Sequence, residues 1–383
     1  MQRRILLNIL SFFRGYDYRL WVLTFGWFIS AMGFAMVIPF IGILFHVEMG
    51  ISMIAVGTVF SISSMSRALF GLLGGEASDQ LGRVKIMGLS MMGRAGSFLV
   101  IALLLNRGAG FFPISGLVIL SSVLGAFYQP VAQAMVADVV VKEKRVEAYS
   151  IIRIGGNLGW ALGPAIGGFV TAISYSFLFL IASLTALIAG GLILIFIKET
   201  VPELENRSKF SFKDLIEIRK DRLFFVYCVI TLVLFTVIGQ LVATFSVFSV
   251  DSVGISKTQL GYLYTLNGGI VVLFQFPMSK FVERYRMTRV LFYGSLLYFV
   301  GYFSVGLARS FAWLFVCMTV ATVAEIVVMP TSMAMVANMA SERHRGRYMG
   351  TFSLVHSLGW AIGPLLGGIL LDFFASQPVI IWS

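Results

Sequence analysis

The segment Gly155–Gly168, which reads GGNLGWALGPAIGG, decides how we interpret the rest of the chain. Its glycines recur at every fourth position of an apolar segment, and on a helix they would form one nearly smooth ridge of Gly155, Gly159, Gly163 and Gly167. In lipid there is little hydrophobic force between helices, and small residues allow the close backbone contact that replaces it. Pro164 removes a helical hydrogen bond at the same place and favours a bend. The segment therefore predicts a membrane helix that packs closely against a neighbour.

The same pattern returns 200 residues later as SLGWAIGPLLGG, residues 357–368. Residues 130–168 and 330–368 align without a gap and share 14 identities. The second copy keeps the ridge and its proline as Gly359, Gly363, Pro364 and Gly367. Two copies at so long a spacing exclude a stacking repeat. We therefore predict a duplicated half-molecule.

The composition indicates an all-α polytopic membrane protein. Hydrophobic residues make up 58% of the 383 and charged residues only 12%, whereas a soluble domain carries roughly a quarter charged residues. A span needs about 20 apolar residues, and such windows follow one another near 20–45, 51–74, 85–105, 111–137, 147–172, 174–197, 223–250, 260–281, 289–307, 311–337 and 348–374. The first has no small-residue cleavage site, so we interpret it as a retained span.

The spans divide the chain into an N-terminal six-helix bundle (1–197), a charged cytoplasmic linker (198–222) and a C-terminal bundle (223–383). Part of the linker could form an amphipathic helix on the membrane surface. Only six residues follow Gln377, too few to cross a bilayer. The duplication requires a twelfth span, so we expect that span to be truncated.

The net charge of +11 is arranged for a membrane and not for a nucleic acid. Of the 29 Lys and Arg residues, 23 lie before the first span or in every second loop. The alternate loops hold only Arg107, Lys257 and Arg309. This positive-inside pattern predicts a multi-pass protein of the plasma membrane whose N-terminus is cytoplasmic. We predict no enzyme, cofactor or metal site, because the chain has no phosphate-binding loop and its three histidines lack metal-ligand spacing.

A loop motif between the second and third spans points to a family. Residues 74–85 read GGEASDQLGRVK, in which the motif positions are Gly75, Asp79, Gly82, Arg83 and Lys85. The motif resembles the loop signature of the major facilitator superfamily, with Gln80 where a basic residue is usual. The ridge at 155–168 resembles that superfamily's antiporter motif, and residues 25–45 resemble the first span of its drug–proton antiporter branch. The resemblance implies two six-helix bundles related by a pseudo-twofold axis, with a twelfth helix that is truncated here.

The loop motif brings with it an expected conformational latch. Asp79 lies near the C-terminus of a helix, where the dipole disfavours an anion, so it needs Arg83 or the start of the eleventh span as a partner. Asp138, at the same end of the fourth span, is the acid expected to pair with Arg83 or Lys85. By resemblance, this cluster would hold the two halves together at their cytoplasmic side. The alternative is a solvated basic loop.

Five ionisable residues lie within predicted spans: Arg67, Arg94, Arg153, Glu325 and His356. A charge at the membrane centre costs on the order of 3 kcal/mol, so these residues should face protein or a wet cavity. Glu325 is the first candidate for proton coupling, because burial favours the neutral carboxyl; a purely structural hydrogen bond is the alternative. His356 is the second candidate, or else a packing residue.

The substrate cavity is expected between the halves. Arg153, Asn157 and Trp160 share a helix face that points away from the glycine ridge, and that face either lines the cavity or packs within one bundle. Gln129, Gln240 and Asn267 are cavity hydrogen-bonding candidates, or else they link neighbouring helices. Arg67 could contact substrate or pin helix ends. For Arg94, the resemblance favours a structural role.

These features together predict a secondary transporter. We expect a monomer in the lipid bilayer that exports small amphipathic molecules in exchange for protons, as its resemblance to multidrug efflux proteins implies. Two alternatives stay open. Three intramembrane arginines against one glutamate could indicate an anionic or lipid-like substrate, and a membrane sensor or scaffold would move nothing.

Overall fold

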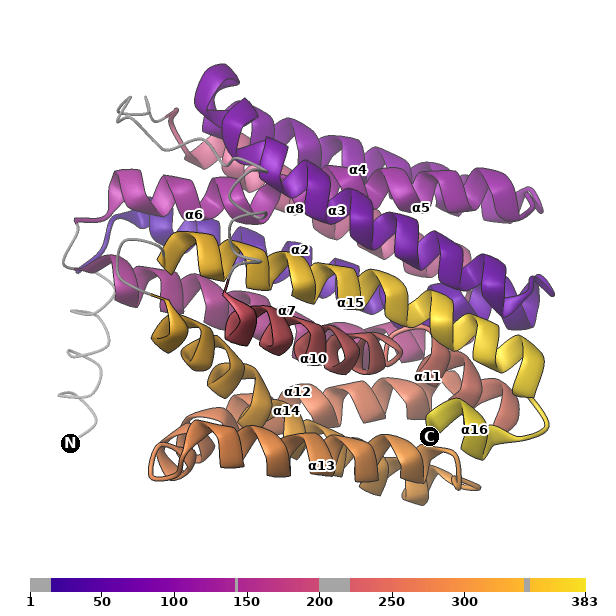
Figure 1. The fold of residues 1–383 in the computed structure, drawn as a ribbon. Helices are drawn as coiled ribbons and strands as arrows, with labels where there is room; N and C mark the ends of the chain where they lie inside the picture. The colour runs from indigo at the N-terminus through magenta and orange to yellow at the C-terminus, as the bar shows by residue number, and fades with distance from the viewer. Residues whose placement is uncertain (1–14, 142–143, 200–220, 341–344) are drawn as a thin grey trace, which may run out of the picture.

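Long helices that run between two ends of the molecule account for almost all of the residues that the computed structural model describes, which are 15–141, 144–199, 221–340 and 345–383 (Figure 1). Their length follows from the sequence, because in lipid every backbone polar group must be satisfied within its own helix. Eight candidate spans among these residues are also apolar enough to cross a membrane. The expected all-α membrane fold is confirmed.

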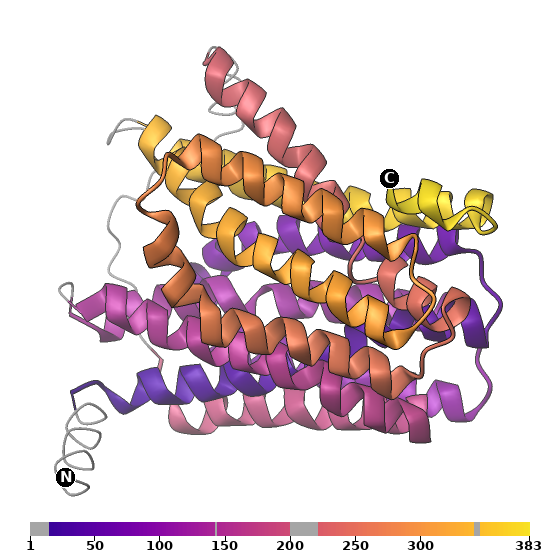
Figure 2. The ribbon, with the colours of Figure 1, turned by 90° about the horizontal axis from the view of Figure 1, so that it is seen from below.

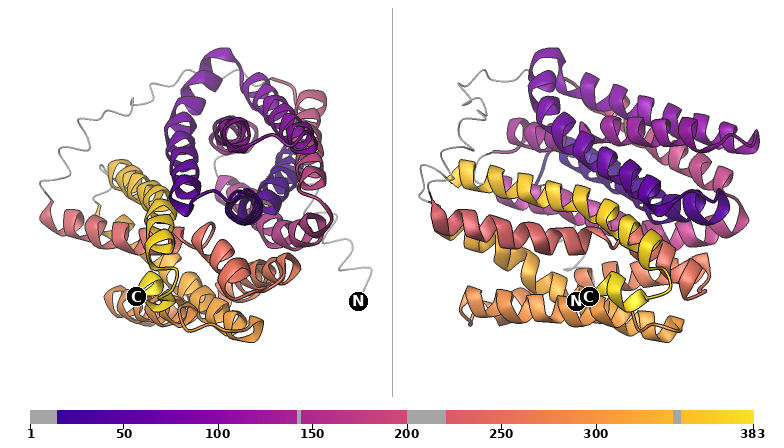
Figure 3. Two further views of the ribbon diagram at one scale, coloured as in Figure 1. Left: turned by 90° about the vertical axis from the view of Figure 1, so that its right-hand side faces the viewer. Right: turned by 45° about the vertical axis from the view of Figure 1, so that its right-hand side comes forward.

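The helices fall into two sets, which we call the N-terminal and C-terminal halves (Figure 3). The N-terminal half comprises α2 (Tyr18–Ile43), its π-helical extension η1 (Leu44–Glu48), α3 (Met53–Leu81), α4 (Arg83–Asn106), α5 (Phe111–Ala126), α6 (Tyr128–Val139), α7 (Arg145–Ile173) and α8 (Tyr175–Phe196). The C-terminal half comprises α10 (Arg222–Gly239), α11 (Thr244–Val247), η3 (Phe248–Ser252), α12 (Lys257–Val282), α13 (Met287–Val305), α14 (Phe311–Met339), α15 (Arg345–Phe374) and α16 (Pro378–Trp382).

Each of the eleven expected spans corresponds to one helix or to two or three successive ones. The largest difference is in α3, which continues to Leu81 instead of ending near residue 74. The surface helix expected in the linker falls within residues 200–220, outside the described part of the chain. We call the end of the molecule near Gly82, Val140 and Arg286 the basic end, and the end near Arg107 and Arg309 the opposite end.

The glycine ridge of α7 packs directly on α2. A Cβ added at Gly155 would lie 2.8 Å from Thr24 O, one at Gly159 would lie 2.5 Å from Phe28 O, and one at Gly163 would lie 2.6 Å from Met32 O. No side chain fits at such distances, so glycine is what allows the two backbones to meet. The first ridge therefore holds the N-terminal half together.

The second ridge repeats this contact in the C-terminal half, between α15 and α10. A Cβ at Gly363 would lie 2.5 Å from Thr236 O, and one at Gly359 would lie 2.8 Å from the carbonyl carbon of Phe235. Gly367 lies against Thr244, just beyond the end of α10. The two copies of the motif thus occupy equivalent positions in the two halves.

Two equivalent seams join the halves, α7 against α12 and α3 against α15 (Figure 2). In the first seam, Gly261 faces the carbonyl oxygen of Pro164, 2.6 Å from where its Cβ would be. In the second, Gly57 faces the carbonyl oxygen of Pro364 in the same way. These matched contacts support the predicted pseudo-twofold relation between the bundles.

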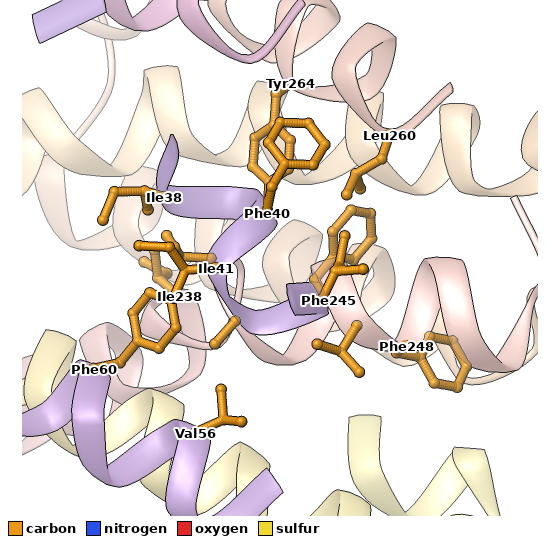
Figure 4. Close-up of a cluster of buried hydrophobic side chains, with 14 of the residues drawn as sticks. Ile38, Phe40, Ile41, Val56, Phe60, Ile238, Phe245, Phe248, Leu260 and Tyr264 are labelled. Carbon is orange, nitrogen blue, oxygen red and sulfur yellow. The ribbon is translucent and has the colours of Figure 1, made fainter. Parts of the chain in front are cut away.

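A hydrophobic cluster fills the space between the halves toward the opposite end (Figure 4). The N-terminal half contributes side chains from α2 and α3, among them Phe40 and Phe60. The C-terminal half contributes Ile238, Phe245 and Tyr264 from α10, α11 and α12. Phe40 and Phe245 are almost wholly buried. The cluster therefore seals this part of the interface against water.

Candidate functional site

A cavity of about 700 Å³ lies between the halves on the basic-end side of this cluster. The N-terminal half contributes walls from α2, α3, α4, α5, α6 and α7, and the C-terminal half contributes walls from α10 and α15. The volume is that of a typical small-molecule site, and such sites are mostly apolar with a few convergent polar groups. The cavity shows both properties.

Two arginines form its most polar wall. The guanidinium carbon of Arg94 (α4) lies 4.6 Å from the ring centre of Phe34 (α2), and that of Arg67 (α3) lies 5.1 Å from the same ring. Gly125 leaves room for Arg94, because a Cβ there would lie 2.7 Å from Arg94 Nη1. Arg67 donates a long hydrogen bond of 3.4 Å to Ser64. Cation–π contacts thus hold two positive charges beside one another.

Arg67 lies deep in α3, which is longer than the predicted span. Arg67 lies 14 residues before Leu81, the last residue of the helix. At 1.5 Å per residue this is about 21 Å from the basic end, too far for the side chain to reach the interface by snorkelling. Arg94 lies 11 residues into α4. It lines the cavity, although a structural role was expected for it.

Aromatic and neutral polar side chains complete the walls. The indoles of Trp27, Trp160 and Trp360 line the cavity, and so does His356. The imidazole of His356 packs edge-on against Phe235, with ring centres 4.7 Å apart. Neutral polar lining residues include Ser64, Ser122, Gln129 and Gln133.

The predicted cavity residues divide into three groups. Trp160 and Gln129 line the cavity. Arg153 and Asn157 are exposed and lie nearer to the basic end, on the same face of α7 as Trp160. Gln240 does not line the cavity. It is buried beside Gly367, because α10 ends at Gly239 and the chain turns toward α15.

Asn267 and Glu325 also lie outside the cavity walls and form a pair within the C-terminal half. The Asn267 amide nitrogen, on α12, donates to Glu325 Oε2 at 2.9 Å and to Thr322 Oγ1 at 3.0 Å on α14. Among the ion pairs of the described residues, none involves Glu325. The Asn267 amide carries no positive charge that would favour the ionised form of this carboxyl group. The two proton-coupling candidates are therefore in different places, His356 at the cavity and Glu325 behind it.

The loop motif forms a polar cluster at the basic end. Arg83 and Asp138 form an ion pair that links α4 to α6 within the N-terminal half. Gly82 ends α3 with φ +99°, a conformation that favours glycine. The backbone of Lys85 lies in the first turn of α4, and its side chain is exposed. Gly75 and Asp79 lie in α3, but their side-chain positions fall outside the described residues.

Glu199 belongs to this cluster and was not predicted from the sequence. Its Oε1 accepts hydrogen bonds from the backbone nitrogens of Arg83 (2.6 Å) and Val84 (3.2 Å). The first amides of a helix lack intrahelical partners and carry partial positive charge, so they favour an anion. The sequence does show an acidic residue directly after the sixth span. Charge patterning alone, however, assigns that residue to the linker and not to this cluster.

Several polar contacts between the halves, among the described residues, lie at the opposite end, where no site residue was predicted. Lys257 Nζ pairs with Glu48 Oε1 at 2.5 Å. Asp372 on α15 accepts hydrogen bonds from the first amides of α3, Met53 N at 2.9 Å and Ile54 N at 2.8 Å. With the hydrophobic cluster, these contacts close the opposite end of the cavity.

Comparison with known proteins agrees with this architecture. The chain is 25% identical over 373 residues to a "Na(+), Li(+), K(+)/H(+) antiporter" of Planococcus maritimus, covering 89% of this chain and 86% of that protein. It is 24% identical over 346 residues to "Multidrug resistance protein MdtH" of Yersinia enterocolitica, covering 89% and 84%.

Solved structures share the fold at lower identity. A bacterial homologue of the human lysosomal transporter Spinster, in an inward-facing and unoccupied conformation, superposes with a TM-score of 0.78 at 16% identity, over 94% of this chain and 83% of that one. The family model described as Major Facilitator Superfamily matches residues 23–251 and 241–382. Together with the duplicated ridges and the central cavity, these matches show that the chain belongs to the major facilitator superfamily, a family of non-enzymatic membrane transporters.

Proposed function

We propose that this protein exports small amphipathic molecules by alternating access, driven by protons that enter the cell. The observation that carries the proposal is the asymmetry of the interface. The cavity begins beside a sealed opposite end, where Lys257–Glu48, Asp372 and the hydrophobic cluster join the halves. The glycine seams let the halves rock about this cavity, which is how duplicated transporters alternate access.

The positive-inside pattern supports a cytoplasmic basic end, and with it a cytoplasmic N-terminus. A cavity on the cytoplasmic side of a sealed interface is arranged to load from the cytoplasm. The printed names of two relatives, a cation/proton antiporter and a multidrug resistance protein, are consistent with exchange and with export. The aromatic walls of the cavity suit the apolar part of an amphipathic substrate.

Glu325 is the residue to which we assign proton coupling. It has no ion-pair partner in the described part of the chain, and the interior of a membrane disfavours an isolated charge. Protonation would remove the charge that accepts the hydrogen bond from Asn267. Asn267 directly precedes Gly268, where a Cβ would lie 2.5 Å from the Cα of Ala161 across the seam between α12 and α7. A proton on Glu325 thus acts beside the surface along which the halves move.

Coupling also requires that the two conformations differ in their affinity for the proton, because only differential affinity shifts a conformational equilibrium. Movement at the α7–α12 seam would change the surroundings of Asn267, and therefore the stability of the Glu325 carboxylate. His356 lines the cavity and is the second proton-binding candidate. Its position suits exchange of a proton with a bound substrate.

The test is the Glu325→Gln variant in proteoliposomes. We expect substrate movement driven by a pH gradient to fall at least tenfold, while exchange of substrate for substrate without a gradient continues. Glu283→Gln is the matched control, because Glu283 is exposed at the end of α12. Full proton-driven transport by the Glu325→Gln variant would rule out this residue as the coupling site.

A further inference from the structure

The cavity holds positive charge that no described residue neutralises. Arg67 and Arg94 both line it, and neither takes part in an ion pair among the described residues. Arg94 is only 5% exposed, and its Nε is buried without a hydrogen-bond partner in the described part of the chain. Buried charges are ordinarily paired, because an isolated one is costly to take out of water. Arg94, with the half-buried Arg67 beside it in the same wall, therefore points to a partner that comes from outside the protein.

Glu325, an acidic residue within a predicted span, does not serve as the counter-ion of these arginines. Glu325 is bonded to Asn267 and is absent from the cavity walls. The remaining ionisable group in the walls is His356, which can add positive charge but not remove it. A cationic substrate would therefore meet two guanidinium groups and no described carboxylate.

Phe34 positions the two arginines for a shared ligand. Both guanidinium carbons lie within 5.1 Å of its ring centre, so the two groups of donors lie around one ring. Arginine presents its donors in a planar fork that fits a carboxylate or a phosphate. Trp160 packs edge-on against the same Phe34, with ring centres 5.9 Å apart, and Trp360 also lines the cavity, so a flat apolar body beside the arginines could contact both indoles.

We propose that this cavity binds amphipathic anions, with the anionic group between Arg67 and Arg94 and the apolar body against Trp160 and Trp360. The inference deepens the proposed function by naming the substrate class, and it rests on the same cavity. Either a free aromatic carboxylate or the phosphate of a single-chain lipid has the required chemistry.

Binding to the purified protein in detergent tests the proposal without relying on transport. Three probes share one naphthylalkyl body and differ only in their head group, which is a carboxylate, a primary amide or a trimethylammonium group. We expect the carboxylate to bind at least tenfold more tightly than the other two. Arg67→Gln and Arg94→Gln should each remove most of this preference, because they weaken binding of the carboxylate much more than binding of the amide. Arg107→Gln, at the exposed far end of α4, should keep it.

Competition with lysophosphatidic acid identifies the source of the anion. Displacement of the carboxylate by micromolar lipid supports the anion site and favours a lipid substrate, whereas no displacement favours soluble carboxylates. Equal binding of the three probes, preference for the cation, or an unchanged preference in both variants would overturn the proposal. If a variant fails to fold, as size-exclusion chromatography would show, the ranking of the probes on the wild-type protein decides.

The two proposals fail in different ways. Proton-driven movement of the amide or the cation, without any preference for the carboxylate, would leave the proposed export function standing and remove the anion site. Arginine-dependent binding of the carboxylate, without proton-driven movement of any probe, would keep the anion site and remove the coupled export.

Discussion

Asp221 joins two helices of the C-terminal half at the basic end. Its Oδ1 accepts a hydrogen bond from Phe224 N at 3.1 Å and so caps the first turn of α10. Its Oδ2 accepts one from the Tyr348 hydroxyl on α15 at 2.7 Å. The Tyr348 hydrogen bond, helped by the backbone amide, lowers the pKa of Asp221 below its ordinary value of 3.8. The charged form is therefore the one that stabilises the folded protein.

A pH dependence follows from the direction of this shift. Because the folded-state pKa is lowered, the stabilising contribution is complete above the ordinary value and is lost as the pH falls through the folded-state value. Asp221→Ala should reduce the free energy of unfolding by about 1 kcal/mol at neutral pH. The gap between wild type and variant should narrow below about pH 4. Thermal unfolding of both proteins in detergent, at steps of about one pH unit from pH 3 to pH 7, measures this difference in stability. A gap that widens as the pH falls would contradict the assignment.

At this scale the sequence predicted residue types better than residue positions. The spacing of charges found Arg67, Arg94 and Glu325, because an ionisable residue inside a span is conspicuous. It did not show that Arg67 and Arg94 share Phe34, or that Glu325 bonds to Asn267, since these contacts join helices whose relative rotation is set by packing. Nor did it show that Gln240 lies outside the cavity walls, just after the end of α10 at Gly239.

At the scale of helices, the glycine ridges determine which pairs meet. Gly163 and Gly363 occupy equivalent places in the contacts of α7 with α2 and of α15 with α10. By contrast, Gly191 in α8 has no atom within 4 Å of where its Cβ would be. The two kinds of glycine should respond to the same substitution with opposite signs.

Gly163→Ala should destabilise the protein, because the new methyl group would lie 2.6 Å from Met32 O and force α2 and α7 apart. Overpacking of this kind costs about 1–3 kcal/mol. Gly191→Ala should leave stability unchanged or raise it by up to about 1 kcal/mol, because alanine favours the helix. Melting temperatures of the two variants in one detergent give the comparison. Equal melting temperatures would mean that the ridge is not a tight contact.

Helix boundaries were largely predictable and helix irregularities were not. Hydropathy located the spans because a run of about 20 apolar residues matches the thickness of a bilayer and is rare in soluble domains. It missed the seven additional residues of α3, most of which are polar or small but continue the helix to the positive-φ glycine at position 82. The π-helical turns η1 and η3 at the opposite end were also unexpected, since hydropathy does not distinguish them from α-helix.

At the scale of the whole molecule, Asp372 is a contact that must break for the opposite end to open. It binds the start of α3 from the other half. Asp372→Ala removes two charge-assisted hydrogen bonds near solvent, which we take as about 1 kcal/mol, or roughly a fivefold shift toward the open state. Asp251→Ala is the control, because Asp251 is an exposed carboxylate at the same end.

Cysteine accessibility reports the shift. In a background with Cys228 and Cys317 replaced by Ala, Ser64→Cys places a thiol in the cavity wall. A membrane-impermeant thiol reagent added on the side of the opposite end should label this thiol several-fold faster in the Asp372→Ala variant than in the Asp251→Ala variant. Identical labelling rates in the two would show that Asp372 does not hold this end closed.

Three of the chain's six tryptophans, Trp27, Trp160 and Trp360, border the cavity. Indole emission is sensitive to the polarity and contacts of its surroundings, and filling the cavity replaces water beside these rings with a ligand. The protein therefore has an intrinsic fluorescence signal that reports whether the cavity is occupied. Binding of an unlabelled, non-fluorescent compound should therefore change the wavelength or the intensity of the tryptophan emission.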